Sequence, residues 1–161
     1  MKDYLLILFR AVIILACASL VGLSVNLIRP KPLAWVYIPP KELDLHGVKV
    51  PLINEKTAHR LFGEQGTVFV DARKKKDYDE SHVQGAIFLD PDEKEELFPS
   101  VQLLLPEGAR IILYCYGPEC DMAEQDADFL AQLGYKNMMI MTSGFRAWEK
   151  AGYPVEGKEK Q

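Results

Sequence analysis

A short apolar run that ends in a cysteine constrains the fold of this chain more than any other stretch. Ile111–Tyr114 has β propensity and the length of one buried strand. Gly117 and Pro118 then interrupt regular structure, and apolar residues recur at helical spacing from Asp121 onward. Cys115 therefore lies where a buried strand ends and a tight loop enters a helix. This arrangement is typical of an open α/β sheet, whose ligands bind at the carboxyl ends of the strands.

Two interpretations of Cys115 are open at this point. The amide groups of the loop and the positive end of the following helix can hold a thiol as its reactive thiolate. Alternatively, Cys115 is a small buried hydrophobic residue, which is the usual state of a free cysteine. The local sequence favours neither interpretation.

Strands alternate with helices along the chain after residue 45. Asn54 is a suitable N-cap for a helix, and Gly134 is a suitable residue to end one. The patterns predict strands at 48–50, 67–70, 86–89, 111–114 and 138–141, helices at 55–62, 77–81, 121–133 and 145–150, and one or two helical turns within 91–105. We therefore predict an α/β fold of three layers, in which helices flank a mainly parallel sheet of about five strands.

The N-terminal segment is predicted to anchor the chain in a membrane. Residues 4–28 are apolar apart from Arg10 and Asn26, and residues 11–28 form 18 consecutive uncharged positions. That length is near the minimum for a transmembrane helix, and Arg10 could reach the headgroups at its end. A cleaved signal peptide fits less well, because the segment is long and no Ala-x-Ala site precedes polar sequence. We predict one uncleaved transmembrane helix.

The sequence divides into four parts: a membrane anchor at 1–29, a proline-rich linker at 30–45, a globular domain at 46–157 and a charged tail at 158–161. Four prolines between residues 30 and 40 disfavour a helix there. Basic residues flank both ends of the anchor, so charge sets its orientation only weakly. The short N-terminal tail favours a single-pass protein of the cell membrane whose domain faces the extracytoplasmic side.

The charge distribution disfavours nucleic acid as a partner. The formal net charge is −4, and residues 1–40 carry four basic residues and one acidic residue, so the remainder is distinctly acidic. Phosphate backbones are bound by a surplus of Lys and Arg. The three cysteines and three histidines are too scattered to form a metal motif or a disulfide framework, so we expect no bound metal.

Four groups of motifs resemble a single family. They are, in chain order, Val70–Arg73 with Asp77–Tyr78 and His82–Ala86, Tyr114–Gly117, Ala127–Leu130 with Gly134–Tyr135, and Ser143–Trp148 with Gly152–Pro154. Each motif is weak alone, but their order and spacing over about residues 46–156 resemble the rhodanese homology domain. The resemblance implies a rhodanese-like fold behind the membrane anchor.

The resemblance also implies a sulfurtransferase. In this family a cysteine accepts a sulfane sulfur as a persulfide and passes it to a nucleophile, and Cys115 matches that position. The implied partners are a polysulfide or persulfide donor and a thiol or protein acceptor, and no metal or organic cofactor is implied. The implied substrate-binding loop consists of Tyr116, Gly117, Pro118, Glu119 and Cys120.

Three further residues match family positions that mostly support structure. They are Asp71, Arg73 and His82. We expect Arg73 to pair with Asp77, and the segment from His82 to Gly85 to form a turn. Trp148 is expected in the core.

The loop departs from the pattern of thiosulfate-using members, which usually place Arg or Lys within it. This loop carries no cation, and Glu119 would repel an anionic donor, so efficient use of thiosulfate is not expected. The related phosphatases need arginine as the sixth residue after the cysteine. That residue is Asp121 here, which excludes phosphatase and arsenate-reductase chemistry.

Cys120 leaves alternatives open. As a resolving thiol it would form a disulfide with Cys115 and allow thiol-redox chemistry. As a structural residue it would only pack under the loop. A third alternative is a catalytically inactive docking module at the membrane, in which Cys115 is inert.

Overall fold

The computed structural model describes residues 2–28 and 41–157, and the chain forms two separate compact units. The first unit spans Met1–Pro39 and the second spans Pro40–Gln161. Most of the predicted linker, residues 30–40, and the predicted charged tail, residues 158–161, lie outside the described residues.

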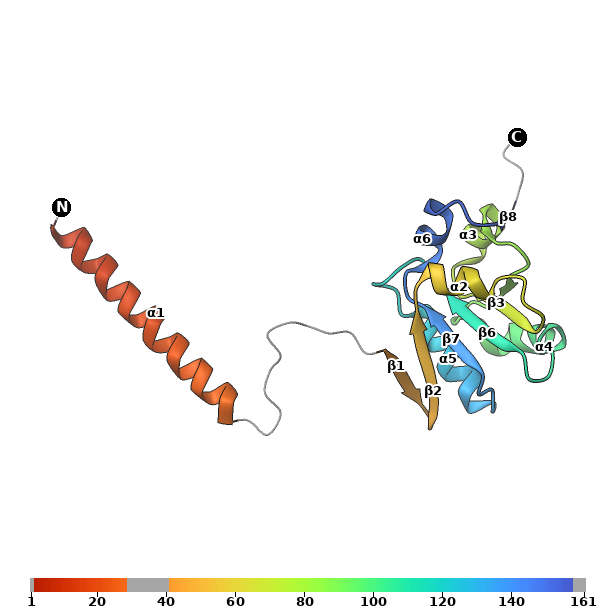
Figure 1. The fold of residues 1–161 in the computed structure, drawn as a ribbon, viewed down its shortest axis with the longest axis horizontal. Coiled ribbons are helices and arrows are strands. Elements are labelled where there is room, and N and C mark those ends of the chain that lie inside the picture. The colour runs from red at the N-terminus through yellow and green to blue at the C-terminus, as the bar shows by residue number, and fades with distance from the viewer. Residues whose placement is uncertain (1, 29–40, 158–161) are drawn as a thin grey trace. The chain divides into compact units, whose positions relative to one another are not determined.

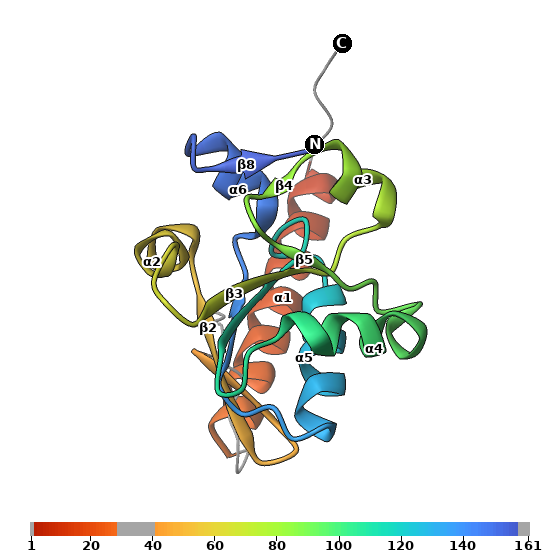
Figure 2. The same cartoon turned by 90° about the vertical axis from the view of Figure 1, so that its right-hand side faces the viewer.

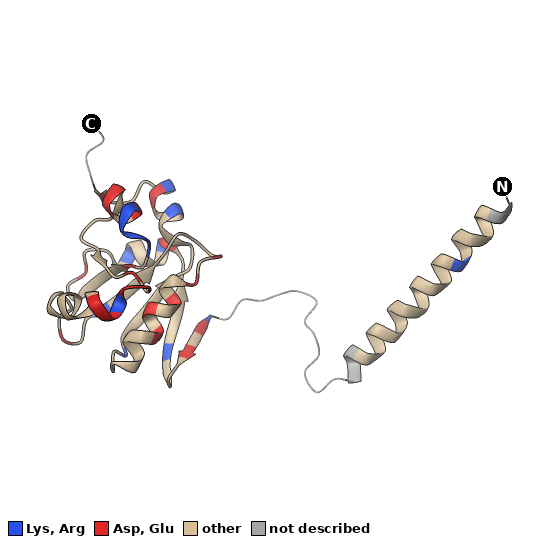
Figure 3. Ribbon diagram, turned by 180° about the vertical axis from the view of Figure 1, so that it is seen from behind, with Lys and Arg blue, Asp and Glu red and all other residues tan. Residues whose placement is uncertain are grey.

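The first unit contains one long helix, α1 (Lys2–Ile28). Within it, Tyr4–Val25 has a mean hydropathy of 2.5, and Arg10 is the single charged residue of that stretch (Figure 3). At about 1.5 Å per residue, these 22 residues extend over roughly 33 Å, close to the thickness of the hydrocarbon core of a bilayer. By length and composition, α1 could cross a membrane once.

The second unit contains a six-stranded sheet in the order β1-β2-β7-β6-β3-β5 (Figure 1). Its strands are β1 (Glu42–Leu45), β2 (Val48–Ile53), β3 (Thr67–Asp71), β5 (Ile87–Phe88), β6 (Arg110–Tyr114) and β7 (Met138–Met141). All neighbours from β2 to β5 pair in parallel, and β1 pairs with β2 antiparallel. The predicted mainly parallel α/β sheet is confirmed, and β6 lies between β7 and β3 within it.

Helices cover both faces of the sheet (Figure 2). One face carries α2 (Glu55–Leu61) and α6 (Gly144–Lys150), and the other carries α4 (Lys94–Leu104) and α5 (Met122–Gln132). Phe69 and Ile112 belong to the core on the α2 side, whereas their neighbours Val70 and Leu113 belong to the core on the α5 side. Successive residues of β3 and β6 thus fill opposite layers, as expected of strands that are buried on both faces.

Three short strands were not predicted. β4 (His82–Val83) and β8 (Val155–Glu156) pair antiparallel in a small second sheet, and two residues are too few to show a periodicity. β1 lies in residues that were assigned to the linker. It joins β2 through a tight turn in which His46 and Gly47 both have positive φ, 52° and 79°, as a two-residue hairpin turn requires.

The predicted helix boundaries depend on local hydrogen bonds that the structure contains. Asn54 Oδ1 accepts a hydrogen bond from Thr57 N at 2.9 Å, so Asn54 caps α2 as predicted. Gly134 has φ 93° and follows the end of α5, also as predicted. α4 is longer than the one or two turns predicted, and it continues through Pro99.

Replacing Trp148 by alanine should destabilise the domain. Trp148 is fully buried, and its indole Nε1 donates to Pro154 O at 2.9 Å. We expect Trp148→Ala to lower the free energy of unfolding of residues 41–161 by about 3–5 kcal/mol, measured by urea denaturation. Leu103→Ala is the control, because Leu103 is 88% exposed. Equal losses in the two variants would contradict the expected role of Trp148.

Candidate active site

Cys115 directly follows the last residue of β6, at the carboxyl edge of the parallel sheet. Its carbonyl oxygen accepts a hydrogen bond from Phe145 N at 2.7 Å, and the carbonyl oxygen of Tyr116 accepts one from Arg146 N at 3.4 Å. The loop after β6 is therefore joined to the first turn of α6.

Gly144 makes this close approach possible. It has φ 67°, a conformation that residues with a side chain rarely adopt. A Cβ atom at Gly144 would collide with the backbone nitrogen of Gly117 and would lie 2.5 Å from the carbonyl carbon of Tyr116. Only glycine therefore allows α6 to begin against the loop.

Cys115 and Cys120 form a disulfide in the structure, with their Cα atoms 6.3 Å apart. This Cα separation is within the usual range for disulfides. Cys115 is only 4% exposed, and its Sγ lies 3.1 Å from Cys120 O and 3.9 Å from Gly117 O. These oxygens carry partial negative charge, so in this state the loop presents carbonyl groups to the sulfur.

A surface cavity of about 500 Å³ lies beside the disulfide. It is lined by Tyr116, Gly117, Pro118, Glu119, Cys120 and Arg146. The structure thus brings all five residues of the predicted loop to one cavity, and Cys120 is the disulfide partner that lines it. Glu119 lines this cavity, and the sequence alone did not determine whether its side chain would do so.

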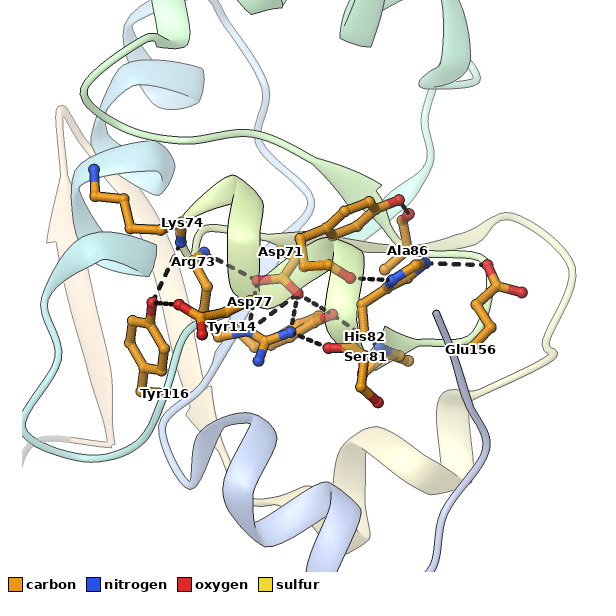
Figure 4. A network of polar contacts seen from close by, with 12 residues as sticks. Asp71, Arg73, Lys74, Asp77, Ser81, His82, Ala86, Tyr114, Tyr116 and Glu156 are labelled. Atoms are coloured by element: carbon orange, nitrogen blue, oxygen red, sulfur yellow. Dashed lines mark hydrogen bonds and ion pairs between the residues drawn. The ribbon is translucent and has the colours of Figure 1, made fainter. Parts of the chain in front are cut away.

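Asp71 is the centre of a buried polar network next to the loop (Figure 4). Its carboxylate, at the end of β3, accepts hydrogen bonds from Arg73 Nη2 at 2.7 Å and from the hydroxyl of Tyr114 at 2.7 Å. Val83 N donates to the same Tyr114 oxygen at 3.0 Å. Burial, followed by the charge of Asp71, raises the pKa of Tyr114 well above its ordinary value, so this hydroxyl remains a donor.

The predicted pairing of Arg73 with Asp77 is wrong. Arg73 pairs with Asp71, and its Nη2 also donates to Ser81 O at 2.6 Å. The physical reason is burial: Asp71 is fully buried and needs a charged partner, whereas Asp77 lies on the partly exposed α3 (Lys75–Glu80). Asp77 instead accepts a hydrogen bond from the hydroxyl of Tyr116 at 2.5 Å.

Tyr116 consequently ties the loop to the segment after β3. Its hydroxyl donates to Asp77 and accepts from Lys74 N at 3.4 Å. Arg73 stacks beside it, with Cζ 5.8 Å from the centre of the Tyr116 ring and 3.9 Å from that of Phe145. The start of the loop is thus held between α3 and α6.

His82 joins the small sheet to the turn that follows it. Its Nδ1 lies 2.7 Å from Tyr78 O, and its Nε2 lies 3.2 Å from Glu156 Oε1. Gly85 N donates to the same oxygen of Glu156 at 2.9 Å, and Gly85 has φ 73°. The expected turn is present at this position, and His82 does not line the cavity beside the disulfide.

Arg146 is a residue that the sequence reasoning missed. The loop itself contains no cation, but Arg146 lines the same cavity from α6, more than twenty positions later in the chain. Arg146 is exposed, and its guanidinium makes no hydrogen bond or ion pair with any residue of the described domain. The Ser-Gly-Phe-Arg sequence could have revealed it only if α6 had been known to contact the loop.

Asp126 is a second residue that was missed. It is fully buried in α5, and neither carboxylate oxygen has a hydrogen-bond partner among residues 41–157. Burial raises the pKa of Asp126 to about 8, with a smaller opposing effect from Lys94. An acidic residue between Ala123 and Ala127 on the apolar face of a helix was the available signal.

Within residues 2–28 and 41–157, no three His, Cys, Asp or Glu side chains gather in a group suited to a metal ion. The cavity beside the disulfide offers one carboxylate, one guanidinium and one sulfur. Its chemistry is that of a charged pocket next to a pair of cysteines.

Residues 54–151 match the model of the Rhodanese-like domain family. The thiosulfate sulfurtransferase GlpE of Haemophilus influenzae is 31% identical over 93 residues, which cover 58% of this chain and 83% of that protein. The chloroplastic rhodanese-like domain-containing protein 14 of Arabidopsis thaliana is 27% identical over 169 residues, which cover 81% of this chain and 75% of that protein.

Solved structures show the same fold. The BH2092 protein of Bacillus halodurans superposes with a TM-score of 0.56 at 30% identity, over 67% of this chain and 76% of that chain. The rhodanese-like domain of the Anabaena protein Alr3790 superposes with a TM-score of 0.57 at 22% identity, over 69% of this chain and 83% of that chain. The second likeness concerns the fold alone.

The buried carboxyl of Asp126 should make stability depend on pH. Its pKa is about 8 in the folded chain and about 3.9 in an unfolded one. The unfolded chain therefore releases this proton first, so the stabilisation is complete below about pH 4 and is lost as the pH rises towards about 8. We expect the thermal midpoint to fall more between pH 5 and pH 8 in the wild type than in Asp126→Asn, measured by circular dichroism.

The control for this measurement is Glu124→Gln, a change of an exposed acid on the same helix. It should keep the pH dependence of the wild type. If Asp126→Asn also keeps that dependence, the raised pKa of Asp126 is refuted.

Proposed function

This chain belongs to the rhodanese-like domain family, and on that premise we propose that it is a membrane-anchored sulfurtransferase that carries sulfane sulfur on Cys115. The observation that carries the proposal is the position of Cys115 at the carboxyl end of a central parallel strand, in a loop that α3 and α6 hold in place. The relatives named thiosulfate sulfurtransferase support the reaction class.

The proposed reaction begins with the thiolate of reduced Cys115. It attacks the outer sulfur of a persulfide donor, so a new bond joins Cys115 Sγ to that sulfur. The sulfur–sulfur bond of the donor breaks, and its electron pair leaves with the donor thiolate. An acceptor thiolate, free or on a protein, then removes the outer sulfur and regenerates Cys115. No metal or organic cofactor enters this sequence.

The loop residues have separate proposed tasks. Tyr116, Gly117, Pro118, Glu119 and Cys120 form the wall against which the donor binds. Asp71 and Arg73 support the wall through Tyr114 and Phe145, and His82 supports it through the small sheet. Cys115 is the catalytic residue.

Anchoring by α1 is part of the proposal. Tyr4–Val25 would form a single transmembrane helix. We place the rhodanese-like domain on the extracytoplasmic side, because a short N-terminal tail precedes the helix. Sulfur transfer would then occur close to the membrane surface, with a thiol or protein acceptor that reaches the domain there. An acidic domain surface does not suit nucleic acid.

The Cys115–Cys120 disulfide favours a second candidate function in thiol-redox chemistry. In this version the thiolate of Cys120 attacks Sγ of the Cys115 persulfide and expels hydrosulfide. The two cysteines are oxidised to a disulfide, and the sulfane sulfur is reduced. A reductant must then reopen the disulfide before Cys115 can accept sulfur again.

Mapping sulfur adducts tests the sulfurtransferase. The full-length chain in detergent micelles is reduced, freed of reductant, and treated with polysulfide or with thiosulfate. We expect mass spectrometry to find one added sulfur on Cys115 and none in Cys115→Ser. Cys17→Ser is the matched control, because Cys17 is the free cysteine of α1, and it should load like the wild type. A Cys115 that gains neither a sulfur nor a disulfide to Cys120 with both donors would leave the inactive docking module as the better account.

Cys120→Ser separates the two candidate functions. If Cys120 resolves the persulfide, the variant should retain the added sulfur on Cys115, whereas the wild type releases sulfide and returns to the disulfide. Sulfide is measured after loading, without any acceptor present. If the wild type and Cys120→Ser hold the persulfide equally long, the redox candidate fails and sulfur transfer alone remains.

A further inference from the structure

The cavity beside the disulfide is lined by side chains of opposite charge. Six residues line it, and two of them are charged, Glu119 from the loop and Arg146 from α6. Both side chains are exposed, and neither makes a hydrogen bond or an ion pair with another residue of the described domain. One free anion and one free cation therefore share one pocket with Cys120.

Arg146 differs from the other arginine near the loop. Arg73 is buried and its guanidinium is used by Asp71 and by Ser81 O. Arg146 uses only its backbone, where its N–H donates to Tyr116 O at 3.4 Å. Since Phe145 N bonds to Cys115 O at 2.7 Å, the backbone of α6 is fixed to the loop while the Arg146 side chain is left available. A free guanidinium is well suited to bind a carboxylate through two parallel hydrogen bonds.

Glu119 is placed on the same cavity by the short loop. It immediately precedes Cys120, whose sulfur is bonded to that of Cys115. Cys115 itself is buried and does not line the cavity, but its disulfide partner Cys120 does, together with both charged residues. A free carboxylate at this position can bind an ammonium group.

We propose that the cavity recognises a small zwitterionic persulfide, the persulfide of an amino acid such as cysteine, as the sulfur donor. Arg146 binds the carboxylate of the donor and Glu119 binds its ammonium group. The inference rests on the proposed function of Cys115. It explains how a loop without a cation can hold a charged donor, because the cation comes from α6.

The same charges discriminate against other donors. Thiosulfate carries negative charge only, so attraction by Arg146 is offset by repulsion from Glu119. A donor with a single charge can pair with either Arg146 or Glu119, and the remaining charged side chain then faces an apolar part of the donor. Cys115 should therefore be loaded fastest by a donor that carries both a carboxylate and an ammonium group.

Four donors that differ in charge test the proposal. They are the persulfides of cysteine, of cysteamine, which lacks the carboxylate, and of 3-mercaptopropionate, which lacks the ammonium group, together with thiosulfate. The reduced full-length chain in detergent micelles is mixed with each donor, quenched by alkylation and analysed by mass spectrometry for sulfur on Cys115. We expect cysteine persulfide to load Cys115 faster than each single-charge analogue by roughly two- to fivefold.

Two variants assign the effect to the proposed residues. Arg146→Gln should abolish the preference for cysteine persulfide over cysteamine persulfide and keep the preference over the 3-mercaptopropionate persulfide. Glu119→Gln should do the reverse. Lys150→Gln on α6 and Glu124→Gln on α5 remove the same charges outside the cavity, and both should keep the wild-type preferences.

The outcomes separate this inference from the proposed function. Equal loading by all donors, or unchanged preferences in Arg146→Gln and Glu119→Gln, would overturn zwitterion recognition while Cys115 remained a sulfur carrier. Absence of added sulfur on Cys115 with every donor, in the wild type and in Cys120→Ser, would overturn the sulfurtransferase and the donor site with it. Faster loading by thiosulfate than by cysteine persulfide would likewise refute the assigned roles of Glu119 and Arg146.

Discussion

The buried ion pair of Asp71 and Arg73 is the interaction on which the carboxyl edge of the sheet depends. A fully buried carboxylate costs several kcal/mol unless it is paired and hydrogen-bonded. Asp71 meets this requirement through Arg73 and through the hydroxyl of Tyr114. Because Arg73 also donates to Ser81 O, one carboxylate holds together the end of β3, the end of β6 and the end of α3.

The position of the loop that contains Cys115 depends on that pair. Tyr114 directly precedes Cys115, and the guanidinium of Arg73 lies against the ring of Phe145, whose amide binds the carbonyl of Cys115. The ion pair therefore supports Cys115 from two sides, through Tyr114 before it in the chain and through Phe145 of α6. A loop fixed in this way brings Cys120 to within bonding reach of Cys115 and leaves Glu119 and Arg146 facing one cavity.

Much of the fold was predictable because its elements carry strong local signals. Apolar runs such as Ile111–Tyr114, the cap Asn54 and the terminator Gly134 each determine a boundary from neighbouring residues alone. The site was predictable in part, since the five loop residues are contiguous. The partner of Arg73 was predicted wrongly, because the sequence does not reveal that Asp71 is fully buried and Asp77 is not. Two-residue strands such as β4 lack any periodicity.

The sequence by itself determined the apolar helix at the N-terminus, the alternation of strands and helices, and a cysteine at the end of a buried strand. These features depend on hydropathy, periodicity and turn residues, which act over a few positions. Only the tertiary structure decided that the Cys115 loop rests on α6, that Arg146 shares a cavity with Glu119, and that Asp126 is buried without a partner. Each of these features depends on how helices and strands that are distant in the sequence pack against one another, which local sequence patterns do not determine.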